Sequence, residues 1–170
     1  AILIGNGVRS LADILAGHGA EKVFVCDNIN VENFLNVSWS AVIVEAQKQS
    51  RANIILIKAS ELGKALAPKV AGKLNAGVAN DCIKVMIDGD TVTVVRPAMA
   101  TKVQELLKFK SPIKVISVKP GLADMDARAQ PKAANRIDIA APAPDPKNML
   151  MKIVAKKTER VDLGDAKIVV

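Results

Sequence analysis

The sequence has few of the residues from which catalytic and metal sites are usually built. It contains one histidine, two cysteines and no tyrosine in 170 residues. Cys26 and Cys82 form no CxxC pair, so a zinc site would lack ligands. His18 is the only imidazole and lies between two glycines at an expected helix end, where a surface position is simpler than a catalytic one. We therefore expect no catalytic residue and no metal, and buried thiols in a reducing compartment, the cytoplasm or a mitochondrial matrix.

Long apolar runs and phosphate-binding loops are also missing. No apolar stretch reaches the roughly 18 residues of a membrane-spanning helix. The first ten residues, AILIGNGVRS, are apolar for only four positions and have no charged stretch ahead of them, so we expect no signal peptide. No Gly-Lys-Ser or Gly-Lys-Thr occurs, which excludes a P-loop. These absences favour a water-soluble domain that binds no nucleoside triphosphate through a P-loop.

Positive charge is in excess, at a formal net charge of +7. Six cations face only Glu105 between residues 96 and 119: Arg96, Lys102, Lys108, Lys110, Lys114 and Lys119. Such a basic stripe could meet phosphates, an acidic protein surface or solvent. Aromatic residues make up only 2% of the chain, and no helix-turn-helix, zinc-finger or RNA-recognition pattern occurs. We therefore predict no nucleic-acid partner.

Short β-branched runs alternate with segments of helical periodicity. Helices are expected at residues 8–17, at residues 30–50 and within residues 58–82. Asn30 would cap the second helix, and the first would bury Val8, Leu11, Ile14 and Leu15 on one face. Central buried strands are expected at Val23–Cys26, Ile54–Ile57 and Ile113–Val118. The pattern predicts an α/β fold, a three-layer αβα arrangement with a mostly parallel sheet.

Two further segments depart from this alternation. Asp88-Gly89-Asp90 lies between two alternating runs and predicts an antiparallel hairpin, whereas residues 99–109 are ambiguous between strand and helix. Residues 120–147 hold five of the eight prolines, so we expect an extended excursion there rather than a helix. Residues 148–155 then return to a strand-like pattern.

One turn is close to a dinucleotide-binding motif. Gly5-Asn6-Gly7 follows a predicted strand and opens a predicted helix, and Asp27 ends the next strand. In that motif the glycines admit a pyrophosphate and the acid binds ribose hydroxyls. The third glycine is replaced by Ser10, which would crowd the helix against the strand. A nucleotide- or small-molecule-binding α/β domain therefore stays open as the alternative function.

The segment ASELGKALAPKVAGKLNAGVANDC carries the most specific signal. Small residues recur every four positions at Ala59, Gly63, Ala67 and Ala71, which predicts a helix lying close to the sheet, with Gly63 and Ala67 against it. Pro68 would kink or restart this helix. The order of residues closely resembles a segment of the electron transfer flavoprotein α subunit, in its N-terminal domain. The matching residues are Gly63, Lys64, Leu66, Ala67, Pro68, Lys69, Ala71, Leu74, Gly77, Asp81 and Cys82.

The resemblance continues through most of the chain, with departures. GAEKVFVCDN, DGDTVTVVRPAMA, KVISVKPG and TERVDLGDAKIVV resemble the corresponding family segments. After Arg96-Pro97-Ala98 the family has an aromatic residue and glycines where this chain has Met99, Ala100 and Thr101. Lys119 stands where the family usually has arginine. The family's first strand and helix have no counterpart before Ala1.

The resemblance implies a redox-assembly role. It implies that residues 1–157 form an α/β domain that includes the excursion at 120–147, and that residues 158–170 connect to a FAD domain that is absent here. The domain would pair with an electron transfer flavoprotein β-like subunit, through a candidate interface of Arg96, Pro97, Lys102, Lys108 and Lys119. FAD is implied by the family, but none is expected on this chain alone, which would serve as a scaffold more than as an enzyme.

Overall fold

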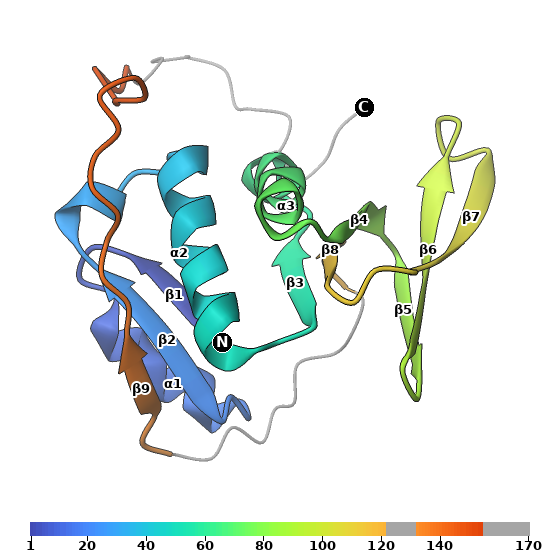
Figure 1. Ribbon diagram of the computed structural model, residues 1–170, viewed down its shortest axis with the longest axis horizontal. Helices are drawn as coiled ribbons and strands as arrows, with labels where there is room; N and C mark the ends of the chain where they lie inside the picture. The colour runs from blue at the N-terminus through green and yellow to red at the C-terminus, as the bar shows by residue number, and fades with distance from the viewer. Residues whose placement is uncertain (122–131, 155–170) are drawn as a thin grey trace, which may run out of the picture.

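A computed structural model describes residues 1–121 and 132–154 (Figure 1). Within these residues nine strands form three sheets, each of three strands. The first holds β1 (Ile2–Gly5), β2 (Lys22–Asp27) and β9 (Asn135–Asp138); the second holds β3 (Ile54–Lys58), β8 (Lys114–Val118) and β4 (Gly77–Cys82). The third holds β5 (Lys84–Asp88), β6 (Thr91–Ala98) and β7 (Val103–Lys108). The α-helices are α1 (Ala12–Gly17), α2 (Asn36–Ser50) and α3 (Glu61–Leu74).

Helices cover both faces of the first parallel sheet and one face of the second, which confirms the α/β fold class. Ile43 and Val42 of α2 and Leu66 and Val70 of α3 pack against one face. Ala12 of α1 packs against the other, over β2. The antiparallel β5–β6–β7 sheet, which we call the side sheet, stands at one end of the molecule (right in Figure 1) and packs on β4 and β8.

Two of the three predicted central strands are central in the structure, and one is not. β2 lies between β1 and β9, and β8 lies between β3 and β4, which confirms Val23–Cys26 and most of Ile113–Val118. Ile54–Ile57 was expected to be buried on both faces, but β3 pairs only with β8 and is an edge strand. Leu56 in its middle is 59% exposed. An apolar composition marks this run as a strand but does not specify how many neighbours it has.

Both predicted amino-terminal helices start later than expected. The second begins at Asn36 instead of residue 30, because the side chain of Asn28 caps a separate 3-10 turn, η2 (Ile29–Val31), and Leu35 is extended. The first is split into a 3-10 turn, η1 (Arg9–Leu11), and the six-residue α1.

The predicted buried face of the first helix is only partly right, because Leu15 packs against β2 but two other members of that face do not. Leu11 and Ile14 are exposed, and the buried residues are instead Ala12 and Ala16. Their small side chains allow α1 to lie close to β2.

The hairpin prediction is confirmed. β5 and β6 pair in antiparallel fashion around Gly89, whose positive φ suits a tight turn. The ambiguous residues 99–109 resolve into β7, which pairs with β6.

The proline-rich excursion contains a strand that the pattern does not predict. β9 pairs in parallel with β2, and Ile139 after it is buried beside Phe24. Asp13 of α1 holds the start of β9, because its carboxylate accepts from the Ala134 N–H at 2.9 Å and from the Arg136 guanidinium at 2.7 Å. The Arg136 hydrogen bond lowers the pKa of Asp13.

The strand expected after the excursion is not found. Residues 148–154 form no strand and Met151 is exposed, while the expected connector at 158–170 lies outside the described residues. The boundaries of the domain stay a prediction.

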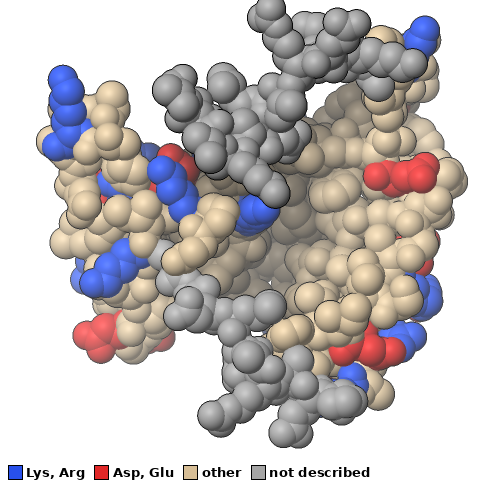
Figure 2. Space-filling view, turned by 180° about the vertical axis from the view of Figure 1, so that it is seen from behind, with Lys and Arg blue, Asp and Glu red and all other residues tan. Residues whose placement is uncertain are grey.

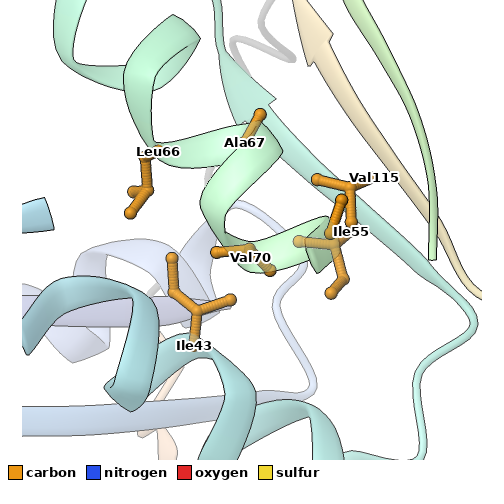
Figure 3. Close-up of a cluster of buried hydrophobic side chains, with 7 residues drawn as sticks. Ile43, Ile55, Leu66, Ala67, Val70 and Val115 are labelled. Carbon is orange, nitrogen blue, oxygen red and sulfur yellow. The ribbon is translucent and has the colours of Figure 1, made fainter. Parts of the chain in front are cut away.

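Helix α3 is held close to β3 by its small residues. Ser60 caps α3 by accepting from the Gly63 N–H at 3.3 Å, and the helix runs through Pro68 without ending. Figure 3 shows Val70 of α3 between Ile43 of α2 and Ile55 of β3. A Cβ added at Gly63 would overlap the carbonyl oxygen of Lys58. Ala67 is fully buried in the same cluster, so the predicted close approach of this stripe is confirmed.

We predict opposite effects from the same substitution at the two glycines of α3. Gly63→Ala should lower the free energy of unfolding by about 1–3 kcal/mol, because the methyl group forces the helix away from backbone. Gly72→Ala meets nothing within 4 Å and should raise it by about 0.5–1 kcal/mol through helix propensity. Urea unfolding of both variants measures the difference. Equal effects would show that α3 does not rest on β3 through Gly63.

Candidate partner interface

In the turn that resembles a dinucleotide motif, the side chain of Asp27 takes up the backbone donors. The Asp27 carboxylate accepts from the Gly7 N–H at 2.6 Å and from the Arg9 N–H at 3.1 Å. These are the donors that a pyrophosphate would need at this turn. The helix that follows, α1, has only six residues. The Asp27 carboxylate therefore lies where the phosphates of a nucleotide would have to bind. This arrangement does not support the alternative function of a nucleotide-binding domain.

The inner face of the side sheet belongs to the hydrophobic core. Val92 and Val94 are buried, and Leu107 and Phe109 pack beside them. They meet Ala79, Cys82 and Ile116 of the parallel sheet. Because side chains alternate along a strand, the residues between them must point away from the core.

The outer face of the side sheet is left uncovered by any described element. The ladder registers place on it Lys84, Met86 and Asp88 of β5, Thr91, Thr93, Val95 and Pro97 of β6, and Gln104, Leu106 and Lys108 of β7. Leu106, at the centre of β7, is 68% exposed. Val95 lies directly opposite Leu106 in the register and is half-buried. An apolar centre with lysines at its margin is the composition of a protein-binding surface.

The predicted interface residues Arg96 and Pro97 occupy opposite faces of β6. Pro97 is on the outer face, half-buried. Arg96 is on the same side as the core residue Val94, and its Nε lies 2.7 Å from the Glu105 carboxylate on β7. Arg96 is therefore committed to an internal ion pair that joins β6 to β7.

Lys102 lies at the tip between β6 and β7, where the backbone is left-handed at three consecutive residues. Met99, Ala100 and Thr101 have φ values of 49°, 53° and 68°. Glycine adopts such φ values without strain, whereas all three of these residues carry side chains. Met99 is 76% exposed, and Lys102, directly after the turn, is exposed as well. Lys102 and Lys108 thus lie at opposite ends of β7.

Lys119 is separate from the other predicted interface residues. Its Nζ lies 3.4 Å from one carboxylate oxygen of Asp81, and the Lys64 Nζ lies 3.5 Å from the other. Asp81 has a φ of 64° at an irregularity of β4, where its N–H donates to the buried Ser117 hydroxyl at 2.8 Å. Sequence reasoning singled out all three charged residues separately but missed that they meet. The signal was available, because carboxyl ends of neighbouring parallel strands lie at one edge of a sheet.

The basic stripe predicted for residues 96–119 does not exist as one surface. Arg96 and Lys119 are paired, and Lys114 is buried with its Nζ donating to the Pro112 carbonyl at 3.1 Å. Lys102, Lys108 and Lys110 remain exposed. Figure 2 shows, on the face seen from behind, basic side chains interspersed with uncharged surface and with acidic side chains at the end of the molecule formed by the side sheet.

Neither cysteine forms a disulfide within the described residues. Both are buried and free, and burial raises the pKa of the Cys26 and Cys82 thiols. Residues 1–121 and 132–154 contain no group of three or more potential metal ligands. No helix among the described residues is long and apolar enough to cross a membrane.

The fold and this surface define a three-layer α/β module that carries an open side sheet with lysines at its margin. The chain belongs to the electron transfer flavoprotein domain family, whose model matches residues 1–144. The resemblance carried by residues 58–82 is thereby confirmed, and the match is to proteins of the α-subunit type.

Three relatives illustrate the match. The electron transfer flavoprotein subunit alpha of Bacillus subtilis is 26% identical over 99% of this chain and 52% of its own length. Protein FixB of Clostridium saccharobutylicum is 27% identical over all of this chain and 52% of its own length. The subunit alpha of Megasphaera elsdenii is 38% identical over 58% of this chain and 30% of its own length. The chain thus spans about half the length of the first two relatives.

We predict that Asp81 has two separable roles. Asp81→Asn keeps a side chain that tolerates the left-handed backbone but removes the charge between Lys64 and Lys119, so it should cost up to about 1 kcal/mol of stability. Asp81→Val adds a β-branched residue at a φ of 64° and should cost roughly 1–2 kcal/mol more. Urea unfolding at low and high salt distinguishes the two roles, since salt screens the loss of the charge interaction but not the backbone strain. Equal losses in both variants would exclude a backbone role.

Proposed function

We propose that this chain is the scaffold part of an electron transfer flavoprotein α subunit, which pairs with a β-like subunit while FAD is bound elsewhere in the assembly. The family match over residues 1–144 supports the redox context. The observation that carries the pairing is the uncovered outer face of the side sheet, with Leu106 at its centre. Residues 1–157 would form the domain and 158–170 the connector, in a reducing compartment such as the cytoplasm.

The outer face favours a partner that is apolar at its centre and acidic at its rim. Leu106, Val95 and Met86 would supply the apolar contacts. Lys102, Lys108 and Lys84 are exposed around them, and buried interface centres are typically surrounded by such polar residues. Arg96 would contribute indirectly, because its pair with Glu105 joins the two strands that form the surface. Pro97 would add a rigid apolar contact on the same face as Val95 and Leu106.

The flavin is better placed outside this chain. A flavin pyrophosphate needs backbone donors at a helix amino terminus or a glycine-rich turn. The only glycine-rich turn between a strand and a helix in the described residues has its donors bound to Asp27. FAD would therefore reach this scaffold as part of the assembled flavoprotein.

We predict that charge reversal at the side sheet slows association with the β-like partner. Lys102→Glu combined with Lys108→Glu should lower the association rate more than it raises the dissociation rate, because exposed charges steer encounter. The matched control is Lys22→Glu with Lys69→Glu, which makes the same change in net charge on β2 and α3. Stopped-flow or surface-binding kinetics at several salt concentrations measure both. An equal effect of the two pairs would place the interface elsewhere.

We predict the opposite kinetic signature for the apolar centre. Leu106→Ser removes an exposed side chain, so it should leave the stability of the free chain nearly unchanged and accelerate dissociation of the complex by about tenfold or more. Leu62→Ser on α3, a leucine that is also exposed, is the control. An unchanged dissociation rate for Leu106→Ser would show that the outer face is not the docking surface.

We also predict that the 170-residue chain alone holds no FAD. Its absorbance spectrum after purification without added cofactor should lack the flavin bands, and titration with FAD should show no saturable binding. Asp27→Ala, which frees the donors of Gly7 and Arg9, tests whether the carboxylate is what closes the turn. A yellow protein with stoichiometric flavin would overturn the scaffold role.

A further inference from the structure

Asn6 and Gly7 form the turn that follows β1, and this pair of residues carries a reaction of its own. A backbone nitrogen can attack the side-chain amide of the asparagine before it, and it does so most readily in glycine, which has no Cβ to hinder the approach. Every other asparagine of the sequence precedes a residue with a side chain. The sequence therefore favours deamidation at Asn6 over any other position.

Deamidation at this turn would consume only water. The Gly7 nitrogen bonds to the side-chain carbon Cγ of Asn6, its proton passes to a base in the solvent, and the amide nitrogen of Asn6 leaves as ammonia. Water then opens the resulting cyclic succinimide at either of its carbonyls. The products are aspartate and isoaspartate, and in isoaspartate the backbone runs through the former side chain.

The turn leaves space for this reaction. Asn6 and Gly7 are both exposed. A Cβ added to Gly7 would meet no atom within 4 Å, so the surroundings of the attacking nitrogen are open. Gly7 has a φ of 71°, in the left-handed region that glycine enters and leaves with little strain. Packing around the turn therefore does not prevent the succinimide from forming.

The attacking nitrogen is instead restrained by a hydrogen bond. The Gly7 N–H donates to one oxygen of the Asp27 carboxylate at 2.6 Å. The other oxygen accepts from the Arg9 N–H at 3.1 Å, so the carboxylate holds the turn at two points. Loss of the Gly7 proton would break a charge-assisted hydrogen bond and place a developing negative charge beside a carboxylate. Asp27 therefore opposes the first step of the reaction.

The isoaspartate product would disturb the packing of the turn. Gly5, just before Asn6, is buried, and a Cβ there would lie 2.7 Å from Val8 Cγ1. Isoaspartate lengthens the backbone between Gly5 and Val8 by one methylene group. The longer backbone would have to give up either this close contact or the hydrogen bonds to Asp27.

A change at this turn would extend to β9. The Arg9 guanidinium lies 2.8 Å from the carboxylate of Asp138, the last residue of β9. The ion pair is exposed, so its own contribution to stability is small. It nevertheless holds the Arg9 side chain against β9, and a shift of the Arg9 backbone would separate the two.

We propose that Asn6 is a deamidation site that Asp27 guards. While the turn is closed, the carboxylate holds the Gly7 N–H and keeps its nitrogen from attacking. When the turn opens, Asn6 is free to convert. The reaction runs in one direction, because ammonia is lost to the solvent. The fraction of molecules that carry aspartate or isoaspartate in place of Asn6 therefore grows with the time that the turn has spent open.

Peptide mapping by mass spectrometry of aged protein tests both the site and the guard. At neutral pH, Asn6 should convert at least about tenfold more slowly in the folded chain than in the urea-unfolded chain, because a charge-assisted hydrogen bond must first break. In folded Asp27→Ala the conversion should be about tenfold faster than in the unaltered folded chain. The matched control is Asp138→Ala, which removes a carboxylate that pairs with Arg9 but leaves the bond to Gly7 in place, and it should not accelerate the conversion.

A second measurement does not depend on any variant. In the unaltered chain, urea below the unfolding transition should raise the hydrogen-exchange rate of the Gly7 amide and the conversion rate of Asn6 by the same factor, because both need the bond to Asp27 to open. Circular dichroism establishes that Asp27→Ala is folded before its rate is compared.

The conversion rates can overturn the proposal in several ways. Equal conversion in the folded and unfolded chains would show that Asp27 does not protect Asn6. Faster conversion in the folded chain would make the carboxylate a base that assists the reaction. No conversion at Asn6 in the unfolded chain would remove the site. Equal acceleration by Asp27→Ala and Asp138→Ala would assign the effect to the local charge in place of the bond to Gly7.

The isoaspartate form, separated by chromatography, tests the link to β9. Its amides should exchange faster at Arg9 and at Ile139, whose N–H donates to the Val25 carbonyl just after β9, and its melting temperature should be lower. The Asn6→Asp variant represents the other product and keeps the length of the backbone, so its exchange at Ile139 should be unchanged. Unchanged exchange at Arg9 in the isoaspartate form would overturn the predicted disturbance. None of these readouts depends on the β-like partner or on flavin.

Discussion

The contact between Gly63 and the carbonyl oxygen of Lys58 fixes the position of α3, and much of the structure depends on it. Without a Cβ at residue 63, the first turn of α3 can rest directly on the end of β3. Leu66 and Val70 are then at the right depth to meet Ile43, so α2 is positioned through α3. Lys64, the next residue, is carried to the edge of the sheet where Asp81 lies. A larger side chain at residue 63 would lift both the core helix and this charged cluster.

Much of the fold was predictable because its elements are encoded locally. The β-branched runs of β2, β3 and β8 and the Asp-Gly-Asp hairpin are signals within a few residues of chain. β9 was missed because Asn135–Asp138 is short and polar and becomes a strand only by pairing with β2. The edge position of β3 was missed for a related reason. The number of neighbours of a strand is a property of the sheet, and no local pattern records it.

The candidate site was harder to predict because neighbours in sequence separate in space. Arg96 and Pro97 are adjacent, yet strand alternation sends one toward Glu105 and the other to the outer face. Lys114, which composition places in a basic stripe, is buried. The exposed centre of the outer face, Leu106, carries no charge and matched no motif, so only the ladder register reveals it. Counting charges along the sequence therefore overestimated the extent of the basic surface. It could not detect the apolar part of that surface.

The clamp between Asp13 and Arg136 has a consequence for how the molecule folds. The two residues are 123 positions apart, so β9 can add to β2 only after the long stretch between them is available. Closing so long a loop carries an entropic cost, and contacts this distant in sequence form slowly. Until then one edge of β2, among the most apolar strands of the protein, has no partner. The sheet that contains β1 and β2, the earliest strands of the described chain, is thus among the last parts of it to be completed.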